Sequence, residues 1–228
     1  MTKLDELQQW LLHNPLGQYV TQTETVFYHN VAASIFGYYA VQFGLPQINL
    51  LESNRINSKT IVGHDVKCDL HFLPFANDSV DLIICPHILE FTDNYDHFLQ
   101  ECYRILIPRG KIVITCFNPK SLFGLFGNKD PLLKQANFIS LGKLKQQLGT
   151  LSFQIQGGKF WGYRPPLHNI DGLTKSAWMD KVGDRWFPTF ANSYGIIASK
   201  EMITINRAIP KAQRAPAAQY APNLGSAS

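Results

Sequence analysis

The stretch Asp69–Asn118 constrains the fold more than any other part of this sequence. Two apolar runs of strand length, at 79–85 and 111–117, enclose a segment whose apolar residues recur at helical spacing. Such runs, bounded by turn residues, are typical of strands buried on both faces of a parallel sheet. Strand, helix and strand in this order predict one right-handed crossover unit. The helical positions are Phe98, Leu99, Cys102, Ile105 and Leu106.

The helix of this unit carries its own start and stop signals. Asp93 can cap the first turn, and the apolar pattern begins after Asp96. Pro108–Gly110 follows the last apolar position, and neither proline nor glycine favours continuing a helix. We therefore expect the helix to end there and the second strand to begin at Lys111.

The order of residues around this unit resembles the middle of the class I S-adenosylmethionine-dependent methyltransferases. It is most similar to the branch that modifies quinones and other small molecules, although the matching positions cover under a third of the chain. The resemblance implies a Rossmann-like three-layer α/β/α sandwich, with a mostly parallel seven-stranded sheet and an N-terminal helical extension. It also implies S-adenosylmethionine as cofactor and a small-molecule substrate. The matching segments are Asp69, Leu73–Phe75, Ser79–Leu82, Glu101, Arg104–Leu106, Pro108 and Gly110–Lys111.

The chain divides into three parts by sequence pattern. With 228 residues, of which 45% are hydrophobic and 17% charged, it suits one globular domain with a sizeable core. Residues 1–36 hold two helical patterns, at 3–13 and from Leu16 to about Ile35, the first ended by Asn14–Pro15. Residues 37–207 form the methyltransferase-like domain, and 208–228 predict a disordered tail rich in Pro, Ala, Gln and Ser.

Composition narrows the classes of partner. No apolar run approaches the ~20 residues of a membrane span, and the N-terminus lacks the apolar core of a signal peptide. The four cysteines form no Cys-x-x-Cys pair, which favours reduced thiols in a cytoplasmic protein over disulfides or a metal site. The net charge of +4 is too small to argue for nucleic acid. The oligomeric state stays open.

The first strand, expected at 37–44, leads into a loop that departs from the family pattern. The family has an acidic residue there, followed by glycines at alternate positions that let the backbone approach the methionine part of the cofactor. Here Gln42 stands where the acid would be and Gly44 matches the first glycine, whereas Pro46 and Ile48 replace the next two. Too few residues separate Gly44 from Asp69 for helix, strand and helix, so at least one element is missing or reduced to a turn.

Two acids are candidates for the adenosyl group. By the resemblance, an acid would bind the ribose hydroxyls, and Glu52 is the nearest candidate; a solvated surface glutamate is the alternative. Asp69 would accept a hydrogen bond from the adenine amino group, with the Leu70 backbone N–H against the ring. The alternative is that Asp69 only caps its own turn.

Cys85 and His87 follow the strand at 79–85 and complete the expected cofactor-binding set. Loops at the carboxyl edge of such sheets carry chemistry. We interpret Cys85 as a buried thiol at the strand end. His87 is the candidate catalytic residue, because an imidazole can face the sulfonium, orient a substrate or accept its proton. A structural histidine is the alternative.

The C-terminal third predicts two more strands and a long connection. Ser140 caps a helix that Gly149 ends, and strands are expected at 153–161 and 194–205, the latter as one strand or a bent hairpin. Residues 162–193 hold aromatic and basic side chains but few regular signals. We expect a lid loop there, suited to a substrate with a ring and a negative charge.

Three functions are compatible with these patterns. Methyl transfer from S-adenosylmethionine to a small molecule leads; the resemblance implies direct displacement at the sulfonium methyl, aided by positioning, with no essential catalytic residue. A methyltransferase-like binding or scaffold protein without activity is the main alternative, because the glycine loop is degenerate. A nicotinamide-dependent oxidoreductase fits less well, since no Gly-x-Gly-x-x-Gly follows the first strand.

Overall fold

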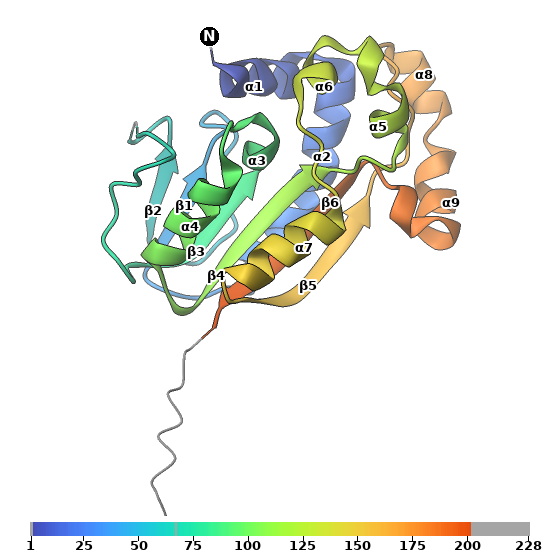
Figure 1. Ribbon diagram of the computed structural model, residues 1–228. Helices are drawn as coiled ribbons and strands as arrows, with labels where there is room; N and C mark the ends of the chain where they lie inside the picture. Colours follow the sequence, from blue (N-terminus) through green and yellow to red (C-terminus); the bar gives the residue numbers. More distant parts are fainter. Residues whose placement is uncertain (1, 67, 202–228) are drawn as a thin grey trace, which may run out of the picture.

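A computed structural model describes residues 2–66 and 68–201. In that part of the chain, six strands form one sheet in the order β2-β1-β3-β4-β6-β5 (Figure 1). The first four strands pair in parallel, and β6 is antiparallel to both of its neighbours. The strands are β1 Tyr39–Phe43, β2 Ser58–Val62, β3 Val80–Pro86, β4 Leu106–Phe117, β5 Phe153–Trp161 and β6 Ser193–Lys200.

The expected α/β class is confirmed, but the count of seven strands is wrong for the described residues. Between β2 and β3 the residues that the structure describes form only isolated bridges, at Val62 with Val66 and at Asp69 with Phe72. The short interval after Gly44 holds β2 and turns but no helix, which confirms that an element is missing there. The described residues between β2 and β3 are taken up by turns and these two bridges, so they add no strand to the sheet.

Helices cover both faces of the sheet. α4 (Tyr95–Ile105) and α7 (Leu141–Thr150) lie on one face, and α2 (Pro15–Ala32) lies on the other (Figure 1). Successive residues of β3 point to opposite faces, so Ile83 packs in the cluster with α4 and α7 while Ile84 packs in the cluster with α2. This double burial explains why the middle of the strand, Leu82–Cys85, is a continuous apolar run.

The remaining helices gather above the carboxyl ends of the strands and along the β5 side (Figure 1). α1 occupies the range expected for it, with Thr2 in a capping box and Asn14 ending α1 and capping α2. No helix among the described residues has the length and apolar character to cross a membrane. These elements are α1 Lys3–His13, α3 Ile88–Phe91, α5 Leu122–Phe126, α6 Pro131–Gln135, α8 Ile170–Lys175 and α9 Trp178–Trp186, with the 3-10 turns η1 Gly127–Lys129 and η2 Pro188–Phe190.

Several expected boundaries are corrected. Asn94, not Asp93, accepts a hydrogen bond at the start of α4. α4 ends at Ile105 and β4 starts at Leu106, so Pro108–Gly110 lies within the strand; the left-handed Arg109 (φ 68°) and a register shift against β3 absorb the irregularity.

The second half follows the expectations more closely. Ser140 caps α7 as expected, but α7 runs through Gly149 to Thr150. β5 occupies the expected range, and β6 covers the first part of the segment 194–205. The expected lid loop at 162–193 is not irregular, since it contains α8, α9 and η2. The predicted tail, 208–228, lies outside the described residues.

Candidate functional site

The candidate site lies where β1 and β3 end side by side. These strands pair in parallel, and strand order reverses between them, which is where open α/β sheets bind ligands. The backbone is strained at both ends: Leu45 and His87 each have φ of 50°, beside Gly44 at 77°. Gln42, Gly44, Cys85 and His87 are therefore brought to one edge, as the sequence predicts.

Gln42 holds the loop after β1 in shape. Its side chain is fully buried, and its Nε2 donates to the carbonyl oxygens of Gly44, Leu45 and Ile48 at 3.1, 3.2 and 2.7 Å. Its Oε1 accepts from the Leu50 N–H at 2.9 Å. An acid at this position could not donate to three carbonyls, so the amide suits a loop that bends back on itself.

His87 lies between two carboxylates inside the protein. Its Nε2 donates to Glu24 of α2 at 2.7 Å and its Nδ1 to Glu90 of α3 at 2.9 Å. The other oxygen of Glu90 accepts from the Phe117 N–H, and the Phe117 ring stacks on the imidazole with 3.9 Å between centroids. All three ionisable side chains are buried, so His87 joins α2, α3 and the end of β4.

The two glutamates decide the charge of His87. Burial lowers its pKa, but the charges and hydrogen bonds of Glu24 and Glu90 outweigh burial and raise the pKa to about 10. The pKa of Glu90 is raised, chiefly because that carboxyl is buried, although His87 opposes the effect. At neutral pH both ring nitrogens therefore carry protons, and neither is free to accept one from a substrate.

An apolar cluster, here called the edge cluster, covers this region. Its buried members come from α1, α2, the loop after β1, α3, the end of β4, α5, α6 and α8, and they lie almost entirely out of contact with solvent. Polar contacts add to the closure, because Gln8 of α1 accepts from the Gln47 N–H at 3.1 Å. The principal members over the site are Leu7, Leu11, Leu45, Phe91, Phe117 and Phe123.

The two predicted acids lie apart from this buried edge. Glu52 is exposed. Asp69 accepts from both the backbone N–H and the Nδ1 of His71 at 2.9 Å, and its side chain is 63% exposed. The hydrogen bonds from His71 lower the pKa of Asp69. Leu70 is partly buried. The residues predicted to hold an adenosyl group are therefore divided, since Gln42, Cys85 and His87 are buried whereas Glu52 and Asp69 are exposed, and in this arrangement they do not fit that group.

Sequence reasoning did not find Glu24, Glu90 or Gln8. Glu90 is three residues from His87, a spacing at which helix neighbours meet, and that signal was available. Glu24 is 63 residues away from His87, so only the fold brings the two together. The sequence does show that Glu24 is an acid in the otherwise apolar stripe of α2 between Val20 and Tyr28, which indicates a buried partner for it.

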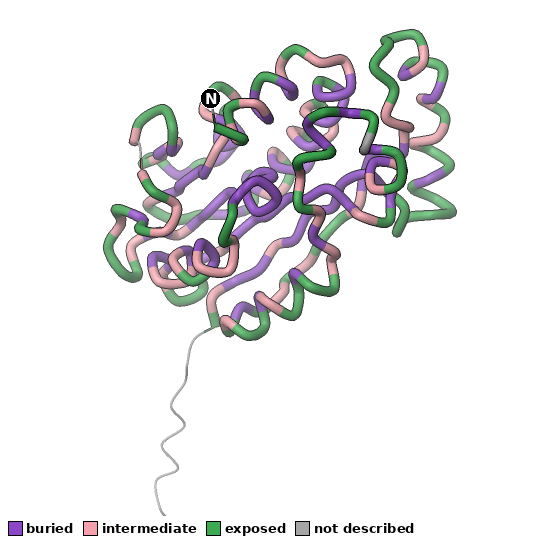
Figure 2. Tube along the Cα trace, turned by 45° about the horizontal axis from the view of Figure 1, so that its top comes forward, coloured by how far each residue is buried: buried purple, intermediate pink, exposed green. Residues whose placement is uncertain are grey.

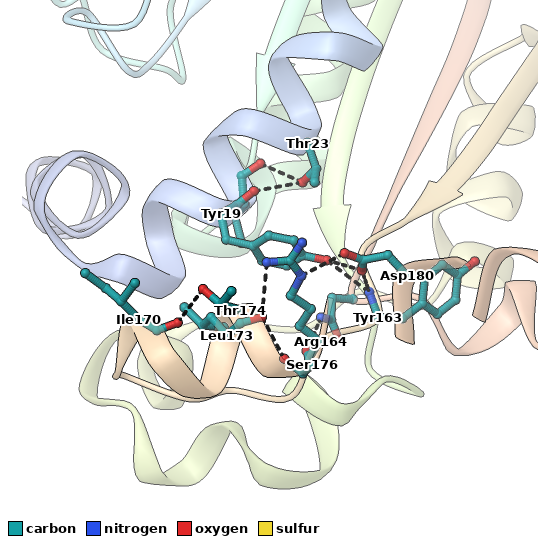
Figure 3. A network of polar contacts seen from close by, with 11 residues as sticks. Tyr19, Thr23, Tyr163, Arg164, Ile170, Leu173, Thr174, Ser176 and Asp180 are labelled. Atoms are coloured by element: carbon teal, nitrogen blue, oxygen red, sulfur yellow. Dashed lines mark hydrogen bonds and ion pairs between the residues drawn. The ribbon is translucent and has the colours of Figure 1, made fainter. Parts of the chain in front are cut away.

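The segment after β5 is tied to α2 by a polar network (Figure 3). Asp180 of α9 accepts from the Tyr19 hydroxyl at 2.5 Å and from Arg164 Nε at 2.7 Å. The Arg164 guanidinium also lies 4.4 Å from the centre of the Tyr19 ring. The same segment, together with Leu122 of α5, lines a cavity of about 400 Å³. The other lining residues are Tyr163, Trp178, Met179, Val182, Gly183, Phe187 and Phe190.

Comparison with curated proteins gives local matches. The uncharacterized protein YafS of Escherichia coli is 42% identical over 88 residues, which are 38% of this chain and 37% of that protein. The malonyl-[acyl-carrier protein] O-methyltransferase of Halorhodospira halophila is 32% identical over 62 residues, 27% of this chain and 21% of that protein. The chain thus spans less than half the length of the curated relatives it matches.

Solved structures match over more of the chain. A SAM-dependent methyltransferase from Archaeoglobus fulgidus has a TM-score of 0.59 at 20% identity, covering 79% of this chain and 94% of that one. One from Thermotoga maritima has a TM-score of 0.55 at 17% identity, covering 86% and 96%. Residues 29–114 also match the family model described as a methyltransferase domain, which implies S-adenosylmethionine as the cofactor. Residues 29–114 thus match a methyltransferase domain, and the chain has the fold of S-adenosylmethionine-dependent methyltransferases, as the resemblance predicts.

Proposed function

We propose that the protein transfers a methyl group from S-adenosylmethionine to a small molecule, with the cofactor across the carboxyl edge of β1 and β3. The observation that carries this is the strained backbone of Leu45 and His87 at the ends of adjacent strands. Left-handed non-glycine residues persist only where their surroundings hold them, and they gather at ligand sites. Here two of them meet at the switch point of the sheet.

The proposed cofactor contacts need an opened form of this edge. Gly44 and the loop that Gln42 holds would face the methionine part, Cys85 and His87 would border the adenosyl group, and Asp69 with Leu70 and Glu52 would take the adenine and ribose. In the closed form Ile88 lies 3.7 Å from where a Cβ on Gly44 would stand, and Phe117 of the edge cluster stacks on His87. We assign no proton transfer to His87, because its two glutamates hold it as a buried imidazolium.

A cavity near α9 supports a small acceptor. At about 400 Å³ it lies within the range of small-molecule sites, and apolar and aromatic side chains line it. Its walls come from α5, α9, η2 and Tyr163, elements that stand at the carboxyl end of the sheet with the candidate site (Figure 1). An aromatic or other flat apolar group is the acceptor that this lining suits.

One observation favours a binding protein without activity. The chain itself uses the hydrogen-bonding groups of the Gln42 side chain and the His87 ring. A ligand at this edge would have to replace contacts that the closed form already makes. A protein that has kept the fold for another partner would have such a filled edge.

Calorimetric titration separates these two functions. The full chain is titrated with S-adenosylmethionine and with S-adenosylhomocysteine, and micromolar binding is expected for an enzyme. Asp69→Ala should weaken it about tenfold, since a charge-assisted hydrogen bond to the adenine is lost. Asp171→Ala is the matched control, because that exposed acid on α8 lies outside the proposed site. No heat with either ligand would favour the binding protein.

The class of acceptor needs a separate experiment. The protein is incubated with methyl-labelled S-adenosylmethionine in a cell extract divided by size into a small-molecule fraction and a macromolecular fraction. Label should appear in the small-molecule fraction alone. Label in protein or nucleic acid would contradict the small-molecule acceptor while leaving methyl transfer standing.

We also propose that the protein is located in the cytoplasm. The four cysteines are unpaired, with Cys68 partly buried and Cys85, Cys102 and Cys116 buried. Unpaired buried thiols are typical of a reducing compartment. Fractionation of the source cells, followed by detection of the native chain, would test the location directly.

A further inference from the structure

Exposed apolar side chains concentrate on one part of the described surface. Of the thirteen large apolar residues that the structure exposes, nine fall between residues 125 and 190. They come from α5, α8, α9, η2 and their connections, the region drawn mostly as exposed at the right of Figure 2. Patches of this kind mark surfaces that meet another apolar phase. The nine are Leu125, Phe126, Leu167, Ile170, Trp178, Val182, Trp186, Phe187 and Phe190.

α9 presents a fixed outward stripe. Its inner side is anchored, because Asp180 binds Tyr19 and Arg164, and a Cβ at Gly183 would lie 2.2 Å from the Tyr163 ring. At 100° per residue, positions 178, 182 and 186 fall on one side of the helix, the side away from Asp180. The side chains there, Trp178, Val182 and Trp186, are 62%, 40% and 67% exposed.

Positive charge borders this stripe. On the α9 wheel, Lys181 and Arg185 lie directly beside Trp178 on the side away from Trp186. In the segments 119–135 and 162–190, six exposed side chains are Lys or Arg and only two are Asp. Residues 1–201 together hold 18 basic and 17 acidic residues, so the excess is a local property. The six are Lys120, Lys129, Lys134, Lys175, Lys181 and Arg185, and the two are Asp171 and Asp184.

We propose that this face of α9 docks on the surface of an anionic lipid bilayer. Trp178, Val182 and Trp186 would enter the interface between head groups and acyl chains, where tryptophan is favoured. Lys181 and Arg185 would lie against lipid phosphates. At nine residues α9 is too short to cross a bilayer, so it lies along the surface. Trp178 and Val182 also line the cavity proposed for the acceptor, so docking would place the bilayer at the mouth of that cavity. The docking itself does not depend on methyl transfer.

Vesicle flotation of the full chain tests the proposal. The protein should float with phosphatidylcholine–phosphatidylglycerol vesicles and much less with phosphatidylcholine alone, and added salt should weaken the binding. Trp178→Ala with Trp186→Ala should weaken binding to anionic vesicles at least about tenfold, because apolar area is lost from the interface. Lys181→Gln with Arg185→Gln should do so by roughly tenfold, since each charge contributes near the surface.

Matched controls separate docking from folding. Phe36→Ala and Phe72→Ala remove aromatic rings that are 67% and 74% exposed elsewhere on the protein, and both should leave flotation unchanged. Lys145→Gln on α7 is the charge control. All variants change exposed side chains, so their urea midpoints should match the wild type.

Tryptophan fluorescence gives a second readout. Trp10 and Trp161 are buried, whereas Trp178 and Trp186 are exposed. A blue shift on adding anionic vesicles should therefore come from α9 and vanish in the double tryptophan variant. Absence of flotation with anionic vesicles, or equal flotation of the double tryptophan variant, would overturn the proposal. Self-association offers a third outcome that would overturn the proposal. If sedimentation shows that the protein self-associates as its concentration rises, and the tryptophan substitutions abolish this, the stripe is an interface between copies of this chain.

Discussion

His87 shows how a residue in a loop can have a structural role that its sequence context does not reveal. The imidazolium lies between Glu24 and Glu90 and stacks on Phe117, with no exposure to solvent. Removing one partner of a buried ionic group leaves an uncompensated charge, which costs more than the pair contributes. The fold should therefore depend on His87 more than on the other histidines in loops.

Replacing this imidazole tests that dependence. His87→Gln should lower the free energy of unfolding by about 3 kcal/mol, because two buried carboxylates lose their cation. Urea unfolding followed by circular dichroism measures the change. His64→Gln is the control, since His64 is an exposed residue beside Asp65 and should change stability by less than about 0.5 kcal/mol. Equal stability of both variants would contradict the buried trio.

The pH dependence of stability follows from the same shift. The pKa of His87 is raised in the folded state from 6.5 to about 10, so its contribution is complete below pH 6.5 and is lost as pH rises through 10. The pKa of Glu90 is also raised in the folded state, so this group likewise makes the free energy of unfolding fall as pH rises. The free energy of unfolding should fall across this window by at least about 1 kcal/mol. His87→Gln should fall less steeply above pH 8, and a parallel decline would contradict the assignment.

At the residue scale, sequence reasoning located positions better than it located partners. It placed Gln42, Gly44, Cys85 and His87 at one edge because parallel strands end together. It did not anticipate that Gln42 would bind three carbonyls or that His87 would meet Glu24. Those contacts depend on tertiary packing of α2 and on a loop without regular structure, and neither leaves a periodic signal.

At the scale of elements, prediction succeeded where a signal was long or capped. α1, the start of α7 and the whole of β5 lie where the sequence predicts them, since amphipathic spacing and Asn14 or Ser140 mark their ends. The sequence pattern did not reveal α5, α6, α8 and α9. These have five to nine residues, too short for the 3.6-residue period to repeat clearly.

The packing of α2 on the sheet makes a prediction at this scale. A Cβ on Gly195 of β6 would lie 2.5 Å from the Phe27 ring and 2.8 Å from Trp161. Gly195→Ala should therefore lower stability by about 1–3 kcal/mol through overpacking. Gly142→Ala is the matched control, because a Cβ there meets nothing within 4 Å and alanine favours the helix. Thermal unfolding compares the two, and a stable Gly195→Ala protein would contradict this close contact.

At the scale of the whole molecule, α1 closes the edge that the proposed cofactor needs. Leu7 and Leu11 pack in the edge cluster, and Gln8 holds the Gln47 N–H. If the open form is a minor population, its share lowers the apparent affinity for S-adenosylmethionine. Any change that loosens α1 without touching the site should then strengthen binding.

Gln8→Ala tests this coupling. It removes the hydrogen bond to the β1 loop and should raise the affinity for S-adenosylmethionine by about threefold, measured by titration calorimetry. Gln9→Ala is the control, because Gln9 is the adjacent exposed residue on α1. Weaker binding by Gln8→Ala would mean that α1 forms part of the site and does not compete with the ligand.

The central crossover was predictable because the middles of β3 and β4 are buried on both faces, and short apolar runs such as Leu82–Cys85 and Ile112–Ile114 are typical of such strands. The count of six strands in the described part of the chain was not predictable, because it depends on how the interval between β2 and β3 is used. The sequence of α9 indicates only the aromatic and basic composition of a lid. The direction of its outward stripe became visible once Asp180 and Gly183 fixed which side of the helix faces the protein.

The reversed direction of β6 has a practical consequence for attaching the protein to a support. β6 runs from Ser193, next to η2, back to Lys200, whose Nζ binds Asp78 and the Tyr103 and Leu106 carbonyls at 2.6–2.8 Å. Eight residues of extended strand span roughly 24 Å. A tether fused after Glu201 would thus start at the amino edge of the sheet and leave both α1 and the tryptophans of α9 facing the bulk solution.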